Sequence, residues 1–139
     1  MERTGRCLCG AVTFTAKGLE PTLAACHCGM CRRWTGGPLL AISPGEVEWV
    51  GEDRIATYRS SEWAERGFCS SCGTSLFYRV TAPGPHQGRE HLAFGTLDDQ
   101  SGFELNLEYF IDIKPEAYAL EGDRTRLTEA EVFARFGGE

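Results

Sequence analysis

The residues of this chain that could do chemistry are its seven cysteines, which fall into three tight groups. The groups are Cys7 with Cys9, Cys26 with Cys28 and Cys31, and Cys69 with Cys72. Thiolates are preferred zinc ligands, and a zinc ion held by four of them is closed and structural. An ion held by three thiolates keeps a coordination position for water or substrate. The groups therefore predict two Zn²⁺ ions per chain, one structural and one able to act on a ligand.

The structural site is expected to combine two cysteine pairs that lie far apart in the chain. Cys7 and Cys9 supply the first pair, and Cys69 and Cys72 supply the second. The second pair has the spacing of a zinc-ribbon knuckle, in which a glycine after the last ligand relieves backbone strain. Strand pairing that returns Cys69 and Cys72 to the first pair would complete the site. The alternative is that Cys7 and Cys9 are ordinary core residues.

Cys26, Cys28 and Cys31 remain for the second site. Three ligands from a short stretch can occupy one face of a metal ion and leave the opposite face toward solvent. Three thiolates on a divalent cation give a net negative charge, which polarises water weakly. Such a centre is better suited to hold an exogenous thiol as a nucleophilic thiolate. These three cysteines are therefore the candidate catalytic residues, and the chemistry they favour involves sulfur.

A fourth protein ligand would close this second site and leave it purely structural. The candidates for that ligand are His27, His86 and His91. Because His27 lies between two of the cysteines, its ring is expected to point away from the metal. An open site, a closed site and an empty site are the alternatives that the sequence leaves.

Arg32 and Arg33 directly follow the cysteine triplet. Guanidinium groups bind carboxylates through paired hydrogen bonds, so both arginines are candidates for holding an anionic ligand beside the metal. The alternative is that they balance the negative charge of the thiolates and of the many acidic residues.

The elements that position these residues are predicted to be short strands. Seventeen glycines and six prolines divide the 139 residues into short segments, which is typical of β-structure with many turns. Alternation places Val12 and Phe14 on one face of a predicted strand. The predicted strands are residues 11–16, 39–43, 47–50, 55–59, 75–80, 91–97 and 108–113. The fold class is therefore mainly β.

One short helix is predicted near the carboxyl end of the chain. Thr128 and Glu131 have the spacing of a capping box, in which each side chain accepts a hydrogen bond from the other residue's amide. Val132 and Phe136 lie on an apolar stripe that is expected to dock on the sheet. Gly137 suits the end of the helix.

The bulk composition favours one domain over residues 1–139 and excludes several classes of partner. Fourteen basic and twenty acidic side chains give a net charge of −6, which disfavours nucleic acid and anionic membranes. The apolar stretch at 38–42 is far too short to span a bilayer, and residues 1–6 contain no apolar signal region. We therefore expect a cytoplasmic protein. Reduced thiols there favour metal binding over the alternative of disulfides.

Several blocks of the chain closely resemble the glutathione-dependent formaldehyde-activating enzyme family, which is shared with centromere protein V. The blocks are residues 5–12, 26–32, 68–76, 95–98 and 111–115. The resemblance implies a β-tent-like fold in which small coiled antiparallel sheets are joined by zinc. It also implies structural zinc at Cys7, Cys9, Cys69 and Cys72, and a second zinc at Cys26, Cys28 and Cys31.

The function that the resemblance implies is that of a carbon–sulfur lyase resembling S-(hydroxymethyl)glutathione synthase, which joins glutathione to formaldehyde. Arg32 or Arg33 would then hold a glutathione carboxylate. The chain departs from the family at Glu108, where many members carry histidine, and near Tyr118, where they carry tryptophan. The implied partners are a thiol such as glutathione and a small aldehyde, with a homodimer left open. The competing hypothesis is a non-catalytic zinc module that binds a small thiol or a protein partner.

Overall fold

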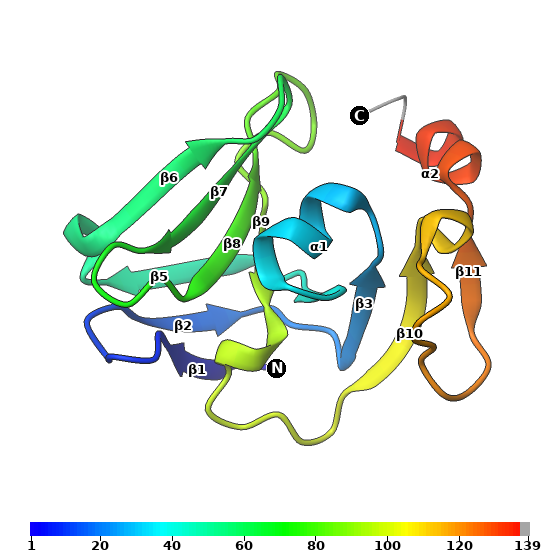
Figure 1. The fold of residues 1–139 in the computed structure, drawn as a ribbon. Helices are drawn as coiled ribbons and strands as arrows, with labels where there is room; N and C mark the ends of the chain where they lie inside the picture. The colour runs from blue at the N-terminus through cyan, green and yellow to red at the C-terminus, as the bar shows by residue number, and fades with distance from the viewer. Residues whose placement is uncertain (137–139) are drawn as a thin grey trace.

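The computed structural model describes residues 1–136, and most of their regular structure is strand arranged in two sheets (Figure 1). The three-stranded sheet has the order β1 (Arg3–Arg6), β2 (Thr13–Lys17) and β5 (Glu46–Val50). The eight-stranded sheet has the order β11 (Thr125–Leu127), β10 (Glu104–Tyr109), β3 (Thr22–Cys26), β4 (Leu39–Ile42), β9 (Glu90–Ala93), β8 (Ser75–Val80), β7 (Ala64–Cys69) and β6 (Ile55–Arg59). The predicted mainly β class is confirmed.

The helices are short and lie at the ends of strands. The α-helices are α1 (Gly29–Thr35) and α2 (Glu129–Phe136), and the single-turn helices are η1 (Glu52–Arg54), η2 (Phe94–Thr96) and η3 (Ile111–Ile113). No helix within residues 1–136 is long and apolar enough to cross a membrane.

The strands of the described chain pair antiparallel, as expected, except at one strand. β10 runs parallel to both of its neighbours, β3 and β11, whereas the other strand pairs within the described chain are antiparallel. The reason lies in the connection from η2, which crosses below the sheet and brings the chain to the far side of β3 (Figure 1). The resulting register places Tyr109 opposite Cys26, at the end of β3 where the cysteine triplet begins.

The predicted strands 55–59 and 75–80 match β6 and β8, and the predictions at 11–16, 39–43 and 47–50 overlap β2, β4 and β5. The prediction at 91–97 runs past β9 into η2, and the prediction at 108–113 overlaps only the last two residues of β10 before the chain turns into η3. No prediction covered β1, β3, β7, β11 or α1. In the four strands the alternation of apolar and polar residues is weak, and the helix α1 has an unusual N-cap residue.

The core between the two sheets contains a row of three aromatic rings among mostly aliphatic side chains. Trp49 of β5 lies 5.1 Å from the ring of Phe14 and 5.4 Å from the ring of Phe77. Phe77 is fully buried and packs against the backbone of Gly67, where an added Cβ would lie 2.2 Å from its ring. Glycine is therefore required at this point of β7, and Phe77 joins the large sheet to the small one.

The carboxyl-terminal helix α2 begins with the predicted capping box. The amide of Thr128 donates to Glu131 Oε1 at 3.0 Å, and the amide of Glu131 donates to Thr128 Oγ1 at 3.2 Å. Val132 is buried, and the ring of Phe136 lies 6.0 Å from that of Tyr109 on β10. The helix thus docks on the sheet as expected. The predicted stop at Gly137 lies outside the described residues.

Candidate metal centres

The first cysteine cluster brings together the turn between β1 and β2 and the turn between β7 and β8. The sulfur atoms of Cys7, Cys9, Cys69 and Cys72 all lie within 4.8 Å of one another. Cys9 Sγ is 3.6 Å from Cys7 Sγ and 3.8 Å from Cys69 Sγ. A tetrahedral zinc with four bonds of about 2.3 Å places its sulfurs about 3.8 Å apart. The ligand type and the spacing both fit zinc, which would link the two sheets.

Hydrogen bonds also join these two turns to the cysteines and to each other. The amide of Val12 donates to Cys7 Sγ at 3.3 Å. The Thr74 hydroxyl lies 3.1 Å from Cys72 Sγ and accepts a hydrogen bond from the Leu8 amide at 3.0 Å, so it touches both turns. Hydrogen bonds from the Thr74 hydroxyl and amide lower the pKa of Cys72 to about 5, which favours the thiolate.

The second cluster is formed by a strand end and the helix that follows it. Cys26 is the last residue of β3, Cys28 is the N-cap of α1, and Cys31 lies in the first turn of the helix. Their sulfur atoms lie within 4.8 Å of one another, and no histidine, aspartate, glutamate or further cysteine of residues 1–136 joins the group. Three soft ligands converging from one side fit a zinc site with a free coordination position.

The same geometry shapes the acidity of the thiols. Hydrogen bonds from the thiols of Cys26 and Cys31 lower the pKa of Cys28, which also accepts from the Cys31 amide at 3.3 Å. The contact with Cys28, reinforced by Cys31 and by burial, raises the pKa of Cys26. The cluster therefore gives up one proton readily and holds another, so a cation is needed to make all three sulfurs anionic.

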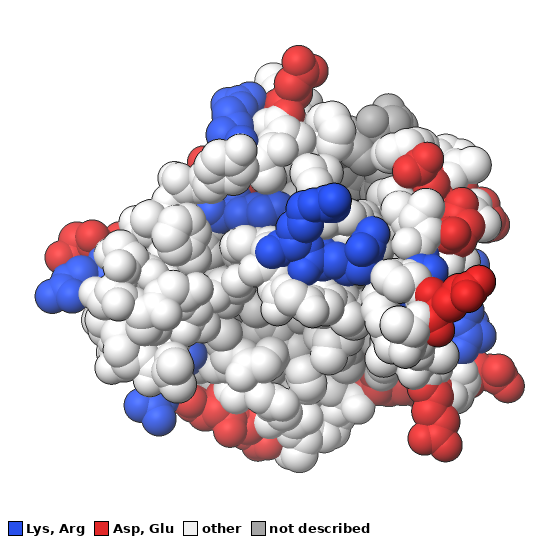
Figure 2. All heavy atoms as spheres, in the orientation of Figure 1, with Lys and Arg blue, Asp and Glu red and all other residues white. Residues whose placement is uncertain are grey.

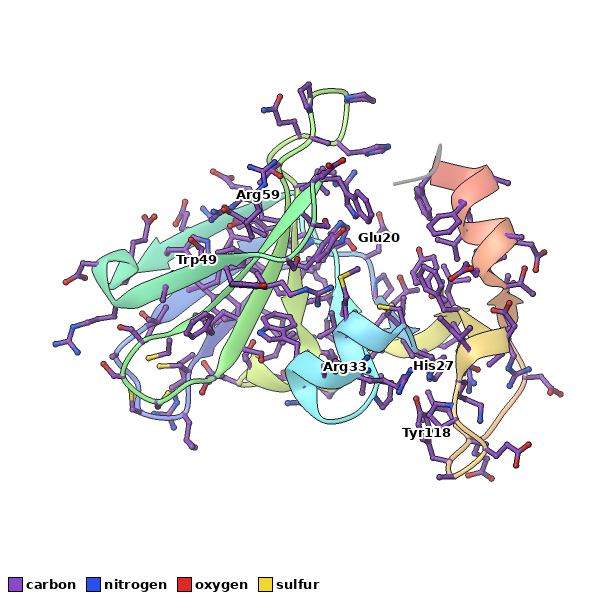
Figure 3. All side chains as sticks on the ribbon, turned by 45° about the horizontal axis from the view of Figure 1, so that its top comes forward. Glu20, His27, Arg33, Trp49, Arg59 and Tyr118 are labelled. Atoms are coloured by element: carbon purple, nitrogen blue, oxygen red, sulfur yellow. The ribbon has the colours of Figure 1, made fainter. Side chains whose placement is uncertain are left out.

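His27 lies between two cysteines of the second cluster, but its ring turns away from their sulfurs. It is fully buried, with Nε2 2.7 Å from Glu108 Oε1 and Nδ1 2.9 Å from the Tyr118 hydroxyl (Figure 3). Both ring nitrogens are therefore engaged, and the ring points away from the cysteines, as its position between two of them led us to expect. The two other candidates for a fourth ligand, His86 and His91, are also absent from the cluster.

Glu108 connects His27 to a pair of arginines. Its second carboxylate oxygen accepts from Arg124 Nη1 at 2.6 Å and from Arg126 Nε at 2.8 Å, and the side chain is 1% exposed. Burial raises the pKa of Glu108, but the hydrogen bonds from Arg124, His27 and Arg126 outweigh it and lower the pKa below its ordinary value. This ionised carboxylate ties the cysteine-bearing loop to β10 and β11.

The two arginines that follow the triplet differ in their surroundings. Arg32 Nε donates to the carbonyl oxygen of His27 at 2.9 Å, which leaves its other nitrogens without a partner in residues 1–136. Arg33 is exposed and donates to the Gly29 carbonyl at 3.3 Å. Figure 2 shows basic side chains gathered over α1 on a face with few acidic groups beside it. This face is therefore positive although the whole chain is acidic.

Sequence reasoning missed Arg66 of β7, which contacts the second cluster directly. It is 4% exposed, and its Nη1 donates to Cys31 Sγ at 3.5 Å. The guanidinium lies 5.0 Å from the ring centre of Trp34 and 5.1 Å from that of Tyr78. Burial raises the pKa of Tyr78 to about 12, so this neighbour stays protonated. An arginine in the strand that leads to Cys69 was the only sequence sign of this contact.

Two hollows on the surface lie away from the cysteine triplet. One, of about 390 Å³, borders Cys7, Thr74 and Asp98, and the other, of about 440 Å³, lies between Pro44 and Glu90. Neither contains a member of the second cluster. The convergence of sulfur ligands and a buried cation, rather than the shape of the surface, makes the second cluster the candidate site.

Comparisons with known proteins agree with this geometry. Residues 2–112 match the family described as glutathione-dependent formaldehyde-activating enzyme. An uncharacterized lyase of Schizosaccharomyces pombe is 34% identical over 133 residues, which cover 94% of each chain. The family match includes all seven cysteines and Arg66, and it ends before Tyr118 and the two arginines that bind Glu108.

Proposed function

Because the chain belongs to the glutathione-dependent formaldehyde-activating enzyme family, we propose that it is a zinc-dependent carbon–sulfur lyase. It joins glutathione, or a related thiol, to formaldehyde or another small aldehyde. The observation that carries this proposal is the group of three cysteines that no further ligand of residues 1–136 closes. Zinc held by Cys26, Cys28 and Cys31 would supply a Lewis acid that lowers the pKa of a substrate thiol.

The reaction itself requires little from the protein. The thiol sulfur forms a bond to the carbonyl carbon, and the carbonyl oxygen takes up a proton to become a hydroxyl, so the proton lost by the thiol is balanced. The reverse reaction breaks the carbon–sulfur bond. Placing the two reactants side by side accounts for much of the acceleration, because it removes the entropy cost of their encounter.

The positive face over α1 supports an anionic thiol as the substrate. Glutathione carries two carboxylates, and Arg32 has nitrogens without a described partner where such a group could bind. Arg33 is exposed one residue further along the same helix. We assign to both arginines the binding of glutathione carboxylates, which positions the sulfur beside the cysteine triplet.

The test follows the addition of glutathione to formaldehyde by exchange NMR on protein that contains two zinc ions per chain. We expect exchange faster than the spontaneous reaction. The Cys28→Ser variant should bind one zinc, stay folded and lose the acceleration. The matched variant Cys72→Ser should also lose one zinc, but it should lower the unfolding temperature because it removes the link between the sheets.

A non-catalytic zinc module that binds a small thiol or a protein partner is the second candidate. One observation favours it: both ring nitrogens of His27 are engaged, so the histidine nearest to the triplet is not free to act as a general base. Fully zinc-loaded protein that fails to speed the exchange would reject the enzyme and leave this candidate. If the wild type speeds the exchange and Cys28→Ser does not, the non-catalytic module is rejected instead.

A further inference from the structure

Arg66 is a buried cation whose counter-charge is not a carboxylate of the chain. Its side chain is 4% exposed, and no aspartate or glutamate of residues 1–136 forms an ion pair with it. Burying an unpaired charge is costly, so buried charges in proteins are paired or bind an ion. The acceptor that Arg66 reaches within residues 1–136 is the sulfur of Cys31, which its Nη1 meets at 3.5 Å.

The guanidinium of Arg66 is also held in a defined orientation. Its central carbon lies 5.0 Å from the ring centre of Trp34 and 5.1 Å from that of Tyr78, and these cation–π contacts restrict where the group can lie. Its N–H donors lie in its plane, and one of them already donates to Cys31. Another, on Nε, is buried and has no partner in the described structure. This unpartnered donor belongs to the same rigid group that touches Cys31.

The charge of the second cluster indicates which kind of ligand Arg66 favours. A divalent cation with three thiolates has a net charge of −1, and the neighbouring Arg66 brings the total to zero. When an anion then binds as the fourth ligand, the total charge of the site becomes −1. Without Arg66, the same anion would bring the total charge to −2. The difference is large in a partly buried site, where charges interact more strongly than in water.

We propose that Arg66 makes the three-cysteine site selective for an anionic fourth ligand, a substrate thiolate, over a neutral ligand. The inference rests on two parts of the proposed function: the cluster binds zinc, and this zinc binds a thiol. It does not depend on the aldehyde step. Arg66 therefore acts on binding, through its charge and through the hydrogen-bond donors of a group that already touches Cys31.

The test measures ligand choice with cobalt(II) in place of zinc, because the absorption of cobalt reports the fourth ligand directly. Glutathione serves as the anionic probe and imidazole as the neutral probe. We expect Arg66→Gln to weaken glutathione binding by about tenfold or more, since one nearby charge and one hydrogen bond are lost. Imidazole binding should change by less than about twofold.

Two further variants make the result specific. Arg59→Gln removes the same charge from the neighbouring strand β6, where the side chain is exposed and donates only to the Glu62 carbonyl at 3.0 Å. It should leave both affinities unchanged. Arg66→Lys keeps the charge but not the planar donor group, so glutathione binding should fall between that of the wild type and that of Arg66→Gln. If Arg66→Gln fails to fold, the lysine variant provides the comparison.

A loss of affinity for glutathione and imidazole alike, in either Arg66 variant, would show a merely structural role and overturn the inference. Equal affinities in all variants would overturn it as well. The proposed function is judged separately, by NMR exchange with formaldehyde. If Arg66 makes the site prefer a thiolate but the protein does not speed that exchange, the inference about Arg66 stands and the proposed enzymatic function is rejected.

Discussion

Glu108 is the residue that holds the loop behind the cysteine triplet. It accepts hydrogen bonds from His27, Arg124 and Arg126, and it is 1% exposed. Removing one partner from such a buried group leaves the remaining charges without compensation, which costs more than the intact network contributes. His27 lies directly between two cysteines, so its anchor also sets the position of the metal ligands.

We predict that Glu108→Gln lowers the free energy of unfolding by about 3–5 kcal/mol at neutral pH, because both arginines lose their counter-charge. The pKa of Glu108 in the folded protein is lower than its ordinary value of 4.5. The carboxylate therefore stabilises the fold fully above pH 4.5, and this contribution is lost as the pH falls through the lower folded pKa. Urea unfolding of both proteins across this pH range measures the difference.

The matched control is Glu48→Gln, which removes an exposed carboxylate 2.8 Å from Lys17. Its unfolding midpoint should stay close to that of the wild type, because exposed ion pairs contribute little. A gap between wild type and Glu108→Gln that stays constant from neutral to acid pH would show that the carboxylate charge is not what stabilises the loop.

The sequence could not have revealed these contacts. Glu108 and His27 are 81 positions apart, and Arg66 lies 35 positions from Cys31. Hydrogen bonds between such distant residues leave no spacing pattern. The cysteines were recognisable because zinc ligands come in short local groups, whereas their supporting residues do not.

At the scale of elements, α1 shows why local sequence rules did not predict the helix that carries part of the cysteine triplet. Its N-cap is Cys28, whose sulfur accepts from the Cys31 amide, and it ends at Gly36 with a φ of 84°. Serine, threonine, aspartate and asparagine are the usual N-caps, so a cysteine there gives no helix signal. Strands such as β6 and β8, which have ordinary composition and clear turns, were predictable from the sequence.

The packing of β7 on β8 leads to a prediction about Gly67. A Cβ at this position would meet the fully buried ring of Phe77, which has no room to move. We predict that Gly67→Ala lowers the free energy of unfolding by about 1–3 kcal/mol. The comparison is Gly95→Ala, where an added Cβ has no atom within 4 Å. Thermal unfolding of the two variants would contradict the prediction if their midpoints were equal.

At the scale of the whole molecule, the four-cysteine cluster and the row of aromatic rings are among the links between the sheets. The cluster takes one pair from the β1–β2 turn and one from β7 and its turn. The mainly β class, the two cysteine clusters and the family were predictable from the sequence. The order of eight strands and the parallel placement of β10 were not, because they depend on a long connection that local patterns do not specify.

Removal of the metal should therefore loosen the molecule at a defined place. We predict that a strong chelator raises amide hydrogen exchange by about tenfold or more in β1, β2 and the β7–β8 turn. Exchange in the pairing of β10 with β11 should change much less, since neither of these strands contains a cysteine.

The Cys28→Ser variant assigns this effect to the correct cluster. Treated with the same chelator, it should lose protection in β1 and β2 as the wild type does, because its four-cysteine cluster is intact before treatment. Increased exchange confined to the surroundings of α1 would contradict a structural role for the four-cysteine cluster.

One strand serves both clusters: Arg66 of β7 contacts the triplet, and Cys69, three residues later, belongs to the other group. The pairing of β7 with β8 shifts register between Gly67 and Phe68, in the middle of this interval. An insertion or deletion there would turn one of the two side chains to the opposite face of the sheet. Evolution should consequently tolerate length changes in the exposed hairpin at 83–89, yet forbid them between this arginine and this cysteine.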